Sequence, residues 1–432
     1  MPHSKKTSDF WYRLDNAGTI YPSVSTRANT NVFRLCCEMH ETVDNVILQQ
    51  AVDISMPSFP YFRAVLRRGF FWYYLEGSDI RPVVQPDTDY PFAPLFFNHR
   101  KELLIRITYF NRRINLDMFH ALADGNGGIQ LLNAIVYNYI RLRYKNELPD
   151  NAPPPPVDTM SSTMMEDSFS RYYDPELRKK PFHKRALTIG GTMLPPGDVR
   201  LIEATVPTKP LLALAKSKGV TVTAYLAALL ILSIYKEMMP RRVARTHPIG
   251  LIIPVDLRGH FASETARNFF GVAEVRYDFS SNPNDFDSIL ASMGEQLKKN
   301  IEPSALASRI SYTMHAQKNI FARFTPLFLK NIILKAVYSK SESATTAIIS
   351  NMGRIAMPAE YASYINRFIC LISPTTWHRF KICFCSYQDQ FVIAMSSCIA
   401  ESGMEKYFVR HLRQNGIEVC LTSNGGVLDE SL

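Results

Sequence analysis

The stretch Phe119-His120-Ala121-Leu122-Ala123-Asp124-Gly125-Asn126-Gly127-Gly128 stands between a predicted strand and a predicted helix. Arg113–Phe119 reads as a strand that follows another strand at Leu103–Phe110. Apolar residues recur at helical spacing from Ile129 onward and predict a helix that begins near Gly127 or Gly128. The sequence therefore places a histidine where a strand ends and an aspartate just before a glycine-rich turn.

This arrangement suits acid-base chemistry. An imidazole at a strand terminus can face a cleft, and its ordinary pKa of about 6.5 leaves it neutral often enough to accept a proton. Gly125 has no Cβ, which gives a bulky substrate access to the site. Asp124 has two open interpretations: it is the partner of His120, or its carboxylate turns away into a salt bridge with a distant arginine.

The same residue types also occur in structural turns, calcium loops and phosphate-binding loops. A purely structural role for His120 stays open. A calcium loop is excluded because its closing acid would fall at Ile135, which cannot ligate calcium. A phosphate-binding loop of the Walker type is excluded because no lysine follows Gly128.

Composition and charge limit the class of protein. The chain has 432 residues, of which 46% are hydrophobic and 20% charged, so it is long enough for two large domains and too apolar to be disordered. The formal net charge of +10 is spread along the chain, with no long basic tract and no nucleic-acid motif. We therefore expect no nucleic-acid partner, and the charge weakly favours a small anionic ligand such as one that carries phosphate.

Cysteine usage and hydropathy indicate a protein of the cytoplasm. The seven cysteines are odd in number and lack zinc-ligand spacing, so we expect them to be reduced and in the core, with no metal site. No signal peptide or transmembrane segment is predicted at the N-terminus or later. The closest candidate, Val222–Tyr235, is too short to span a membrane and predicts a buried helix.

Mixed strands and helices occur on both sides of a break between Leu148 and Gly197, which contains the proline run 153–156. We interpret the break as a domain crossover, with a lid over a cleft as the alternative. The predicted domains are 1–175, a crossover at 176–200, and 201–432. The expected elements of the second domain are helices at 209–218, 221–239 and 286–300, two helices between 305 and 337, a helix at 404–414, and strands at 249–255, 272–278, 346–350, 368–372, 380–387 and 391–398.

The stretch around His120 resembles the HxxxDG motif of the chloramphenicol-acetyltransferase-like superfamily. Alcohol acetyltransferases, plant-type acyl-CoA acyltransferases, wax-ester synthases and peptide-synthetase condensation domains belong to this superfamily. Two further segments strengthen the resemblance. Ile253-Pro254-Val255-Asp256-Leu257-Arg258, followed by Asn268-Phe269-Phe270-Gly271, is similar to a signature of condensation-like proteins, and Ser350-Asn351-Met352-Gly353 looks like the strand end that the family places later.

The resemblance implies an α/β fold of two similar sandwich domains that form a pseudo-dimer with a central channel. It also implies the roles of the motif residues: His120 as general base, Asp124 as a structural acid paired with Arg258, and Gly125 as the small residue beside the channel. Ser350 and Asn351 are candidates for an oxyanion or substrate contact. Phe119 stands where double-histidine members carry a second histidine, and no DFGWG motif is present, so the single-histidine branches are the nearer likeness.

The function implied by the resemblance is transfer of an acyl group from acyl-CoA, as co-substrate, to a small-molecule acceptor hydroxyl. No bound cofactor and no metal is expected. The alternatives are ester or amide formation from a thioester on an acyl carrier protein, and an inactive relative that serves as a scaffold or binding module.

Overall fold

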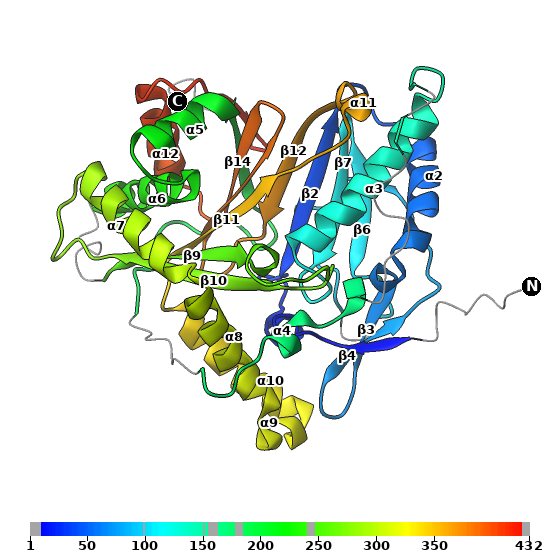
Figure 1. Cartoon of the computed structure of the whole chain (residues 1–432), viewed down its shortest axis with the longest axis horizontal. Coiled ribbons are helices and arrows are strands. Elements are labelled where there is room, and N and C mark those ends of the chain that lie inside the picture. Colours follow the sequence, from blue (N-terminus) through cyan, green and yellow to red (C-terminus); the bar gives the residue numbers. More distant parts are fainter. Residues whose placement is uncertain are drawn as a thin grey trace, which may run out of the picture.

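The strands of the described part of the chain build sheets of five, seven and three strands, and Figure 1 shows how the sheets and helices are arranged. The structure is a computed structural model that describes residues 10–97, 100–149, 152–153, 163–177, 185–239 and 247–425. Each of the two larger sheets packs against its own large apolar core. The mixed α/β architecture predicted from the sequence is thus present in both parts of the molecule.

The five-stranded sheet carries the strand that ends in the histidine. Its order is β12 (Ile365–Ile372), β2 (Val32–Met39), β7 (Arg113–Phe119), β6 (Ile105–Phe110) and β5 (Gln85–Pro86). Helix α3 (Gly125–Arg143) packs on β2 and β7, and α2 (Asn45–Ser55) packs beside α3 (Figure 1). The core between them contains Leu116 of β7 and Leu132 and Ile135 of α3, all fully buried.

The seven-stranded sheet forms the second half. Its order is β10 (Phe270–Tyr277), β9 (Ile249–Asp256), β11 (Ala347–Arg354), β13 (Phe380–Tyr387), β14 (Gln390–Ser397), β8 (Arg200–Pro207) and β15 (Cys420–Ser423). The helices of this half are α5 (Thr208–Ser217), α6 (Val222–Met238), α7 (Phe286–Asn300) and α12 (Gly403–Gln414). Helix α6 is buried on nearly all sides, because α5, α7, α12 and β9 surround it.

Strand β12 joins the two halves. It lies between β11 and β13 in sequence, yet it pairs antiparallel with β2 in the five-stranded sheet, with Cys370 opposite Leu35. It also packs against β13 and β14 of the other sheet. The halves are therefore interlocked by strand exchange. The boundaries 1–175, 176–200 and 201–432 stay a prediction.

The remaining elements surround the two sheets. A small sheet contains β1 (Trp11–Arg13), β4 (Tyr73–Gly77) and β3 (Ala64–Arg68). The other helices are α1 (Tyr21–Val24), α4 (Ser168–Arg171), α8 (Pro303–Lys318), α9 (Ile320–Phe324), α10 (Leu327–Glu342) and α11 (Ala359–Ala362). Short 3-10 turns lie at Met56–Ser58, Pro60–Phe62, Thr163–Met165 and Leu257–Gly259.

The sequence predicted two helices between residues 305 and 337, and the structure has three. Asn319 ends α8 and caps α9 with its side chain, which accepts from the backbone N–H groups of Phe321 and Ala322. Pro326 then starts α10 at the next turn. The proline run of the predicted crossover, from Pro154 onward, lies outside the described residues.

All seven cysteines are free, as predicted. Five of them are buried, whereas Cys398 is half-buried and Cys420 is exposed on β15. The expectation that every cysteine lies in the core was therefore wrong for Cys420, because β15 is the last strand of its sheet and its alternate residues face solvent.

Within the described ranges, no individual helix has both the length and the apolar character needed to cross a membrane. The pair α5 and α6 passes the same test only when taken together, and it is bent by 82° at the break between the helices.

The start of α3 fits closely against the second half. A Cβ on Gly127 would collide with the backbone oxygen of Ala266, which cannot rotate away. We therefore predict that Gly127→Ala lowers the free energy of unfolding by about 1–3 kcal/mol, although alanine favours helix at most positions. Chemical denaturation measures this change. Gly259→Ala is the control, because no atom lies within 4 Å of its added Cβ, and an equal loss in both variants would contradict the interpretation.

Candidate active site

His120 lies at the end of β7, where the two halves meet. Its backbone N–H donates to the carbonyl of Asn31 at 2.9 Å. Its half-buried ring stacks on Tyr21, with centroids 4.6 Å apart and planes 17° from parallel. Phe33 of β2 meets the ring edge at 5.2 Å, and Phe270 of β10 lies 5.5 Å away. Aromatic side chains from both halves thus hold the imidazole in place.

Asn268 determines which nitrogen of the imidazole carries the proton. Its amide Nδ2 donates to the backbone oxygen of His120 at 3.1 Å and to Oδ2 of Asp15 at 3.1 Å. The amide oxygen therefore faces Nδ1 of His120, 3.1 Å away, and can only accept. Nδ1 must carry the hydrogen in the neutral ring. The lone pair is then on Nε2, the nitrogen that a base would use.

Asp15 fixes the orientation of Asn268. Its buried carboxylate accepts from the Asn268 amide and from the backbone N–H groups of Asn268 and Gly18. Burial raises the pKa of Asp15 to about 6, and the nearby charge of Arg267 opposes this rise. The carboxylate is therefore mostly ionised at neutral pH and accepts hydrogen bonds only.

The surroundings of His120 favour its neutral form. Burial lowers the pKa of the imidazole, and it outweighs the negative charge of Asp124, which acts in the opposite direction. The positive charge of Lys381 on β13 adds to the lowering of this pKa. A neutral imidazole with a free lone pair is the form required of a general base.

Asp124 caps helix α3 and joins the two halves. Its Oδ1 accepts from the backbone N–H of Gly127 at 3.1 Å, and its Oδ2 accepts from the N–H of Phe269 at 2.9 Å. Arg258 pairs with the same carboxylate at 2.9 Å, and both side chains are about nine-tenths buried. Of the two interpretations of Asp124, the structure shows the salt bridge with a distant arginine.

Arg258 lies in the 3-10 turn that follows β9, and all three nitrogens of its guanidinium donate hydrogen bonds. Besides Asp124, it binds Asp256 at 2.9 Å and donates to the carbonyl oxygens of Thr265 and Arg267 at 2.8 and 2.7 Å. Burial would lower the pKa of Arg258, but Asp124 and Asp256 more than compensate and raise it. The arginine therefore stays charged and holds a loop that contains Asn268.

Gly125 and Ser350 face the same region, whereas Asn351 does not. A Cβ on Gly125 would touch the Met352 side chain of β11, with Sδ at 2.7 Å. Ser350 shares the Met352 face of the strand because side chains alternate. Asn351 points to the opposite face, where its amide donates to Thr223 at 3.0 Å and its oxygen accepts from the N–H of Gly353.

Sequence reasoning missed several neighbours of His120. Asp15, Tyr21 and Phe33 come from the N-terminal part of the chain, for which no element was predicted. Lys381 is buried on β13, and burial lowers its pKa to about 8 in spite of Glu342 nearby. An isolated lysine within the strand Phe380–Tyr387 was the one signal in the sequence that could have pointed to it.

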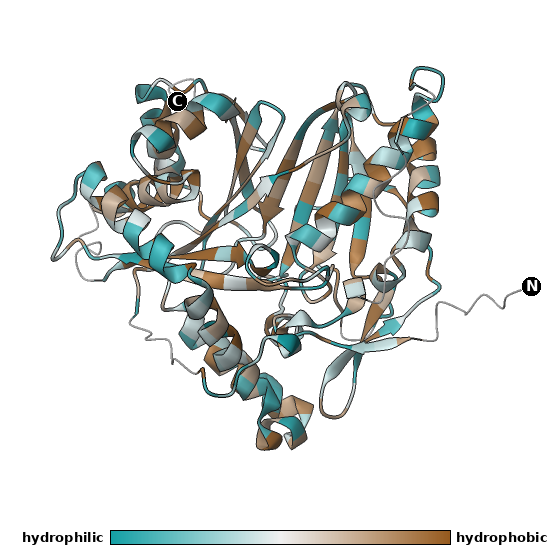
Figure 2. Ribbon diagram, in the orientation of Figure 1, coloured by the Kyte–Doolittle hydropathy of each residue, from teal (hydrophilic) through white to brown (hydrophobic). Residues whose placement is uncertain are grey.

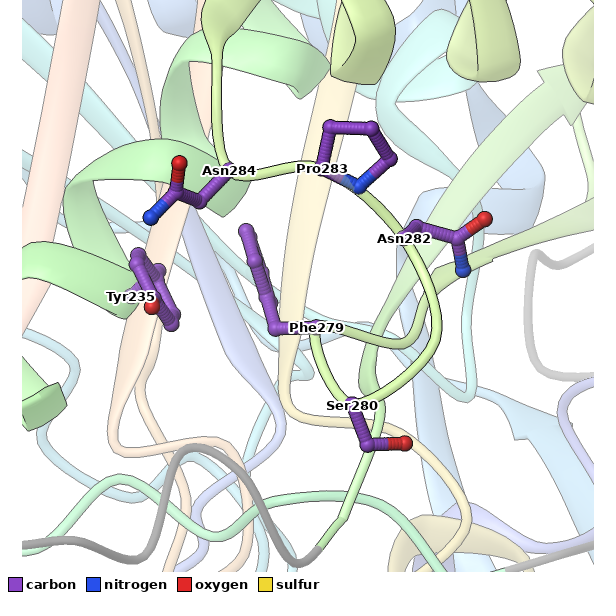
Figure 3. A pocket seen from close by; sticks show the side chains of 6 residues that line it. All are labelled: Tyr235, Phe279, Ser280, Asn282, Pro283 and Asn284. Carbon is purple, nitrogen blue, oxygen red and sulfur yellow. The ribbon is translucent and has the colours of Figure 1, made fainter.

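A surface pocket of about 410 Å³ lies elsewhere, between the end of α6 and the loop before α7 (Figure 3). Its wall contains the stacked rings of Tyr235 and Phe279, 3.8 Å apart, together with Ser280, Asn282, Pro283 and Asn284. None of the residues predicted for the site lines this pocket. Among the described residues, moreover, no group of three histidines, cysteines or acids is placed to hold a metal ion.

Comparisons with known proteins bear on the fold of the chain. A family model described as "Phthiocerol/phthiodiolone dimycocerosyl transferase C-terminus" matches residues 191–361. Among solved structures, polyketide synthase associated protein 5 from Mycobacterium tuberculosis superposes with a TM-score of 0.58 at 14% identity, covering 93% of this chain and 96% of that one. A comparison with curated protein sequences found no significant match.

Two further structures extend the likeness. TRI101 of F. graminearum, complexed with coenzyme A and deoxynivalenol, has a TM-score of 0.63 at 13% identity, covering 95% of this chain and 99% of that one. The first condensation domain of the CDA synthetase has a TM-score of 0.57 at 13% identity, with coverage of 94% and 96%. The chain has the chloramphenicol-acetyltransferase-like fold. The two-domain fold expected from the HxxxDG resemblance is confirmed, and the family model that matches residues 191–361 supports the superfamily.

In this fold, the site residues lie where the two halves meet. His120 ends a strand of one half, and the loop that contains Arg258 and Asn268 comes from the other. The matched family is a transferase, and the similar structures include an associated protein of a polyketide synthase, a coenzyme A complex and a condensation domain. These likenesses support acyl transfer as the general chemistry.

We predict that Asn268→Ala lowers kcat about ten-fold or more, because Nδ1 loses the acceptor that holds its hydrogen and the correct tautomer is no longer favoured. Asn268 is a positioning residue, so the pH profile of the variant should shift together with kcat. Asn282→Ala, in the surface pocket, is the matched control. An unchanged profile in Asn268→Ala would show that Asn268 does not orient the imidazole.

Proposed function

We propose that the protein is an acyltransferase that moves an acyl group from acyl-CoA to the hydroxyl of a small-molecule acceptor, with His120 as general base. The supporting observation is the Nδ1 contact of His120 with an amide oxygen that can only accept, which leaves the Nε2 lone pair available. The lowered pKa of the ring supports the same role.

The reaction follows from this protonation state. Nε2 takes the proton of the acceptor hydroxyl while the oxygen attacks the thioester carbonyl carbon. The tetrahedral intermediate then collapses, the carbon–sulfur bond breaks, and the imidazolium returns its proton to the departing thiolate. Asn268 keeps its acceptor oxygen against Nδ1 throughout, so the ring need not turn between the two proton transfers.

Asp124 and Arg258 are positioning residues in this proposal. Their ion pair fixes the turn that follows His120 and, on the other side, the loop that carries Asn268. Neither side chain needs to touch the substrate. Gly125 has no Cβ because the Met352 side chain fills the space beside it, so the glycine lets the turn pack closely against β11.

Ser350 is the better candidate of the two strand-end residues for an oxyanion contact. It is half-buried on the β11 face that carries Met352, the residue against Gly125. The side chain of Asn351 is already engaged with Thr223 and Gly353. We therefore assign the oxyanion or substrate contact to Ser350 and a structural role to Asn351.

The formal charge of +10 and the coenzyme A in the TRI101 complex support acyl-CoA as donor. The likeness to a condensation domain supports a second candidate, transfer from a thioester on an acyl carrier protein to a hydroxyl or an amine. The same base serves both reactions, and the donor distinguishes them. An acidic carrier protein would dock on a basic surface.

We predict that His120→Ala lowers the transfer rate about 10²- to 10⁴-fold, which is the usual contribution of a general base. The measurement is thiol release and product formation with a panel of acyl-CoA and acyl-carrier donors against alcohols and amines. His40→Ala, an exposed histidine, is the matched control.

Undiminished transfer in His120→Ala would remove His120 from the mechanism. A wild-type chain that is folded but turns over none of the donors would support the scaffold alternative. Transfer from carrier-bound thioesters alone would replace acyl-CoA as the donor and leave the role of the base intact.

We also predict how the rate depends on pH. The base must be neutral, so kcat/KM rises with pH and levels off once the imidazole has lost its proton. Because burial lowers the pKa of His120, the midpoint should lie below the ordinary value of about 6.5. A pH–rate profile of the wild type measures this, and a midpoint above 6.5 would contradict the assigned environment.

A further inference from the structure

Helices α9 and α10 expose large apolar side chains on the outside of the molecule. Phe321 is 83% exposed, Phe324 67% and Ile332 63%. Phe328, Leu329, Ile333 and Val337 are also exposed, at the spacing of three and four residues that gathers them on one side of α10. An exposed apolar patch of this size marks an interaction surface.

Several polar side chains of α10 face the protein, whereas a surface helix ordinarily turns its polar side chains to solvent. Its polar residue Asn331 faces the protein, accepting from Ser23 Oγ at 2.8 Å and donating to Tyr73 OH at 3.1 Å. Lys330 Nζ donates to the backbone oxygen of Phe71 at 2.7 Å. The helix therefore contacts the protein through these polar groups and the buried Leu327, and it presents most of its large apolar side chains to the surroundings.

The β3–β4 hairpin extends the same surface. Phe70 at its turn is 72% exposed, and Trp72 is exposed as well. The backbone N–H of Leu327 donates to the oxygen of Phe70 at 2.9 Å, and the rings of Phe71 and Phe324 lie 6.2 Å apart. The helices and the hairpin thus form one surface, here called the apolar tip: Phe70, Trp72, Ile320, Phe321, Phe324, Phe328, Leu329, Ile332, Ile333 and Val337.

The apolar tip projects from the body of the molecule. Figure 1 shows α9 and the start of α10 at its lower edge, away from both large sheets and next to the hairpin of β3 and β4. Figure 2 shows apolar residues coloured brown on these helices. A projecting shape suits insertion into a soft surface better than enclosure of a partner segment.

The charge around the apolar tip is of one sign. Residues 303–341 contain six lysines and arginines and no aspartate or glutamate: Arg309, Lys318, Arg323, Lys330, Lys335 and Lys340. Four of these, Lys318, Arg323, Lys335 and Lys340, are exposed. Cations without acids beside exposed phenylalanines are complementary to a surface that is anionic outside and apolar beneath.

We propose that the apolar tip binds the surface of an anionic phospholipid bilayer. The phenylalanines and Trp72 enter the boundary between headgroups and acyl chains, and the exposed lysines and arginines contact the headgroup phosphates. A lipid surface is favoured over a protein partner because exposed cations without acids stand in the same segment as exposed apolar side chains, and this segment projects from the molecule. The inference does not depend on the proposed acyl transfer.

Flotation of the full chain with vesicles tests the proposal. The expected result is binding to phosphatidylcholine mixed with phosphatidylserine, weaker binding to phosphatidylcholine alone, and loss of the difference at high salt. The triple variant Phe321→Ser, Phe324→Ser, Phe328→Ser should lower the fraction bound about ten-fold or more. Its matched control is Val46→Ser, Ile54→Ser, which removes exposed apolar side chains of α2.

A charge variant separates the two contributions. Lys335→Glu with Lys340→Glu should reduce binding to the phosphatidylserine vesicles and leave binding to phosphatidylcholine alone nearly unchanged. Far-UV circular dichroism checks that each variant is folded.

Three results would overturn the proposal. They are no flotation of the wild type with either vesicle, equal loss in the α2 control, and self-association through the apolar tip, seen by light scattering and abolished by the triple variant, without vesicle binding. The last result would identify the surface as a protein interface.

Discussion

The ion pair between Asp124 and Arg258 is the constraint on which the site depends. It joins the turn after β7 to the turn after β9, so it spans the two halves, and both side chains are nearly buried. Arg258 also holds the carbonyl oxygens of Arg267 and Phe269, on either side of Asn268. Removing one partner of such a pair typically costs about 3–5 kcal/mol, because the other charge stays buried. The position of the histidine and the position of the amide that orients it therefore depend on the same contact.

Much of the architecture could be predicted from local patterns. The strands Arg113–Phe119 and Phe380–Tyr387 and the helix Phe286–Asn300 have the predicted bounds. Helix α3 begins two or three residues earlier than its apolar periodicity indicated, because Asp124 caps it from the position before Gly125. The HxxxDG motif led to His120 and Asp124, and the second segment that ends at Arg258 supplied the arginine that pairs with Asp124.

The rest depends on contacts distant in sequence. Asp15 and Asn268 are 253 residues apart, and nothing in either neighbourhood indicates that they meet. Tyr21 is in a helix of four residues, too short for a periodic signal. Lys381 is a lysine within an apolar strand, and its burial depends on neighbours that the local sequence does not show. Apolar residues predict a core well, whereas a polar residue becomes informative only when its distant partner is known.

Strand β12 has a consequence for how the polypeptide is made. Glu38 of β2 and Asn366 of β12 are hydrogen-bonded although 328 residues separate them. At a synthesis rate of about 5–20 residues per second, β2 leaves the ribosome tens of seconds before its neighbour exists. Its hydrogen-bonding edge, flanked by Phe33, Leu35 and Cys37, is a template for wrong pairing during that interval. Nascent chains would thus be open to wrong pairing through most of translation, and chaperones that hold unfolded chains would act during this interval.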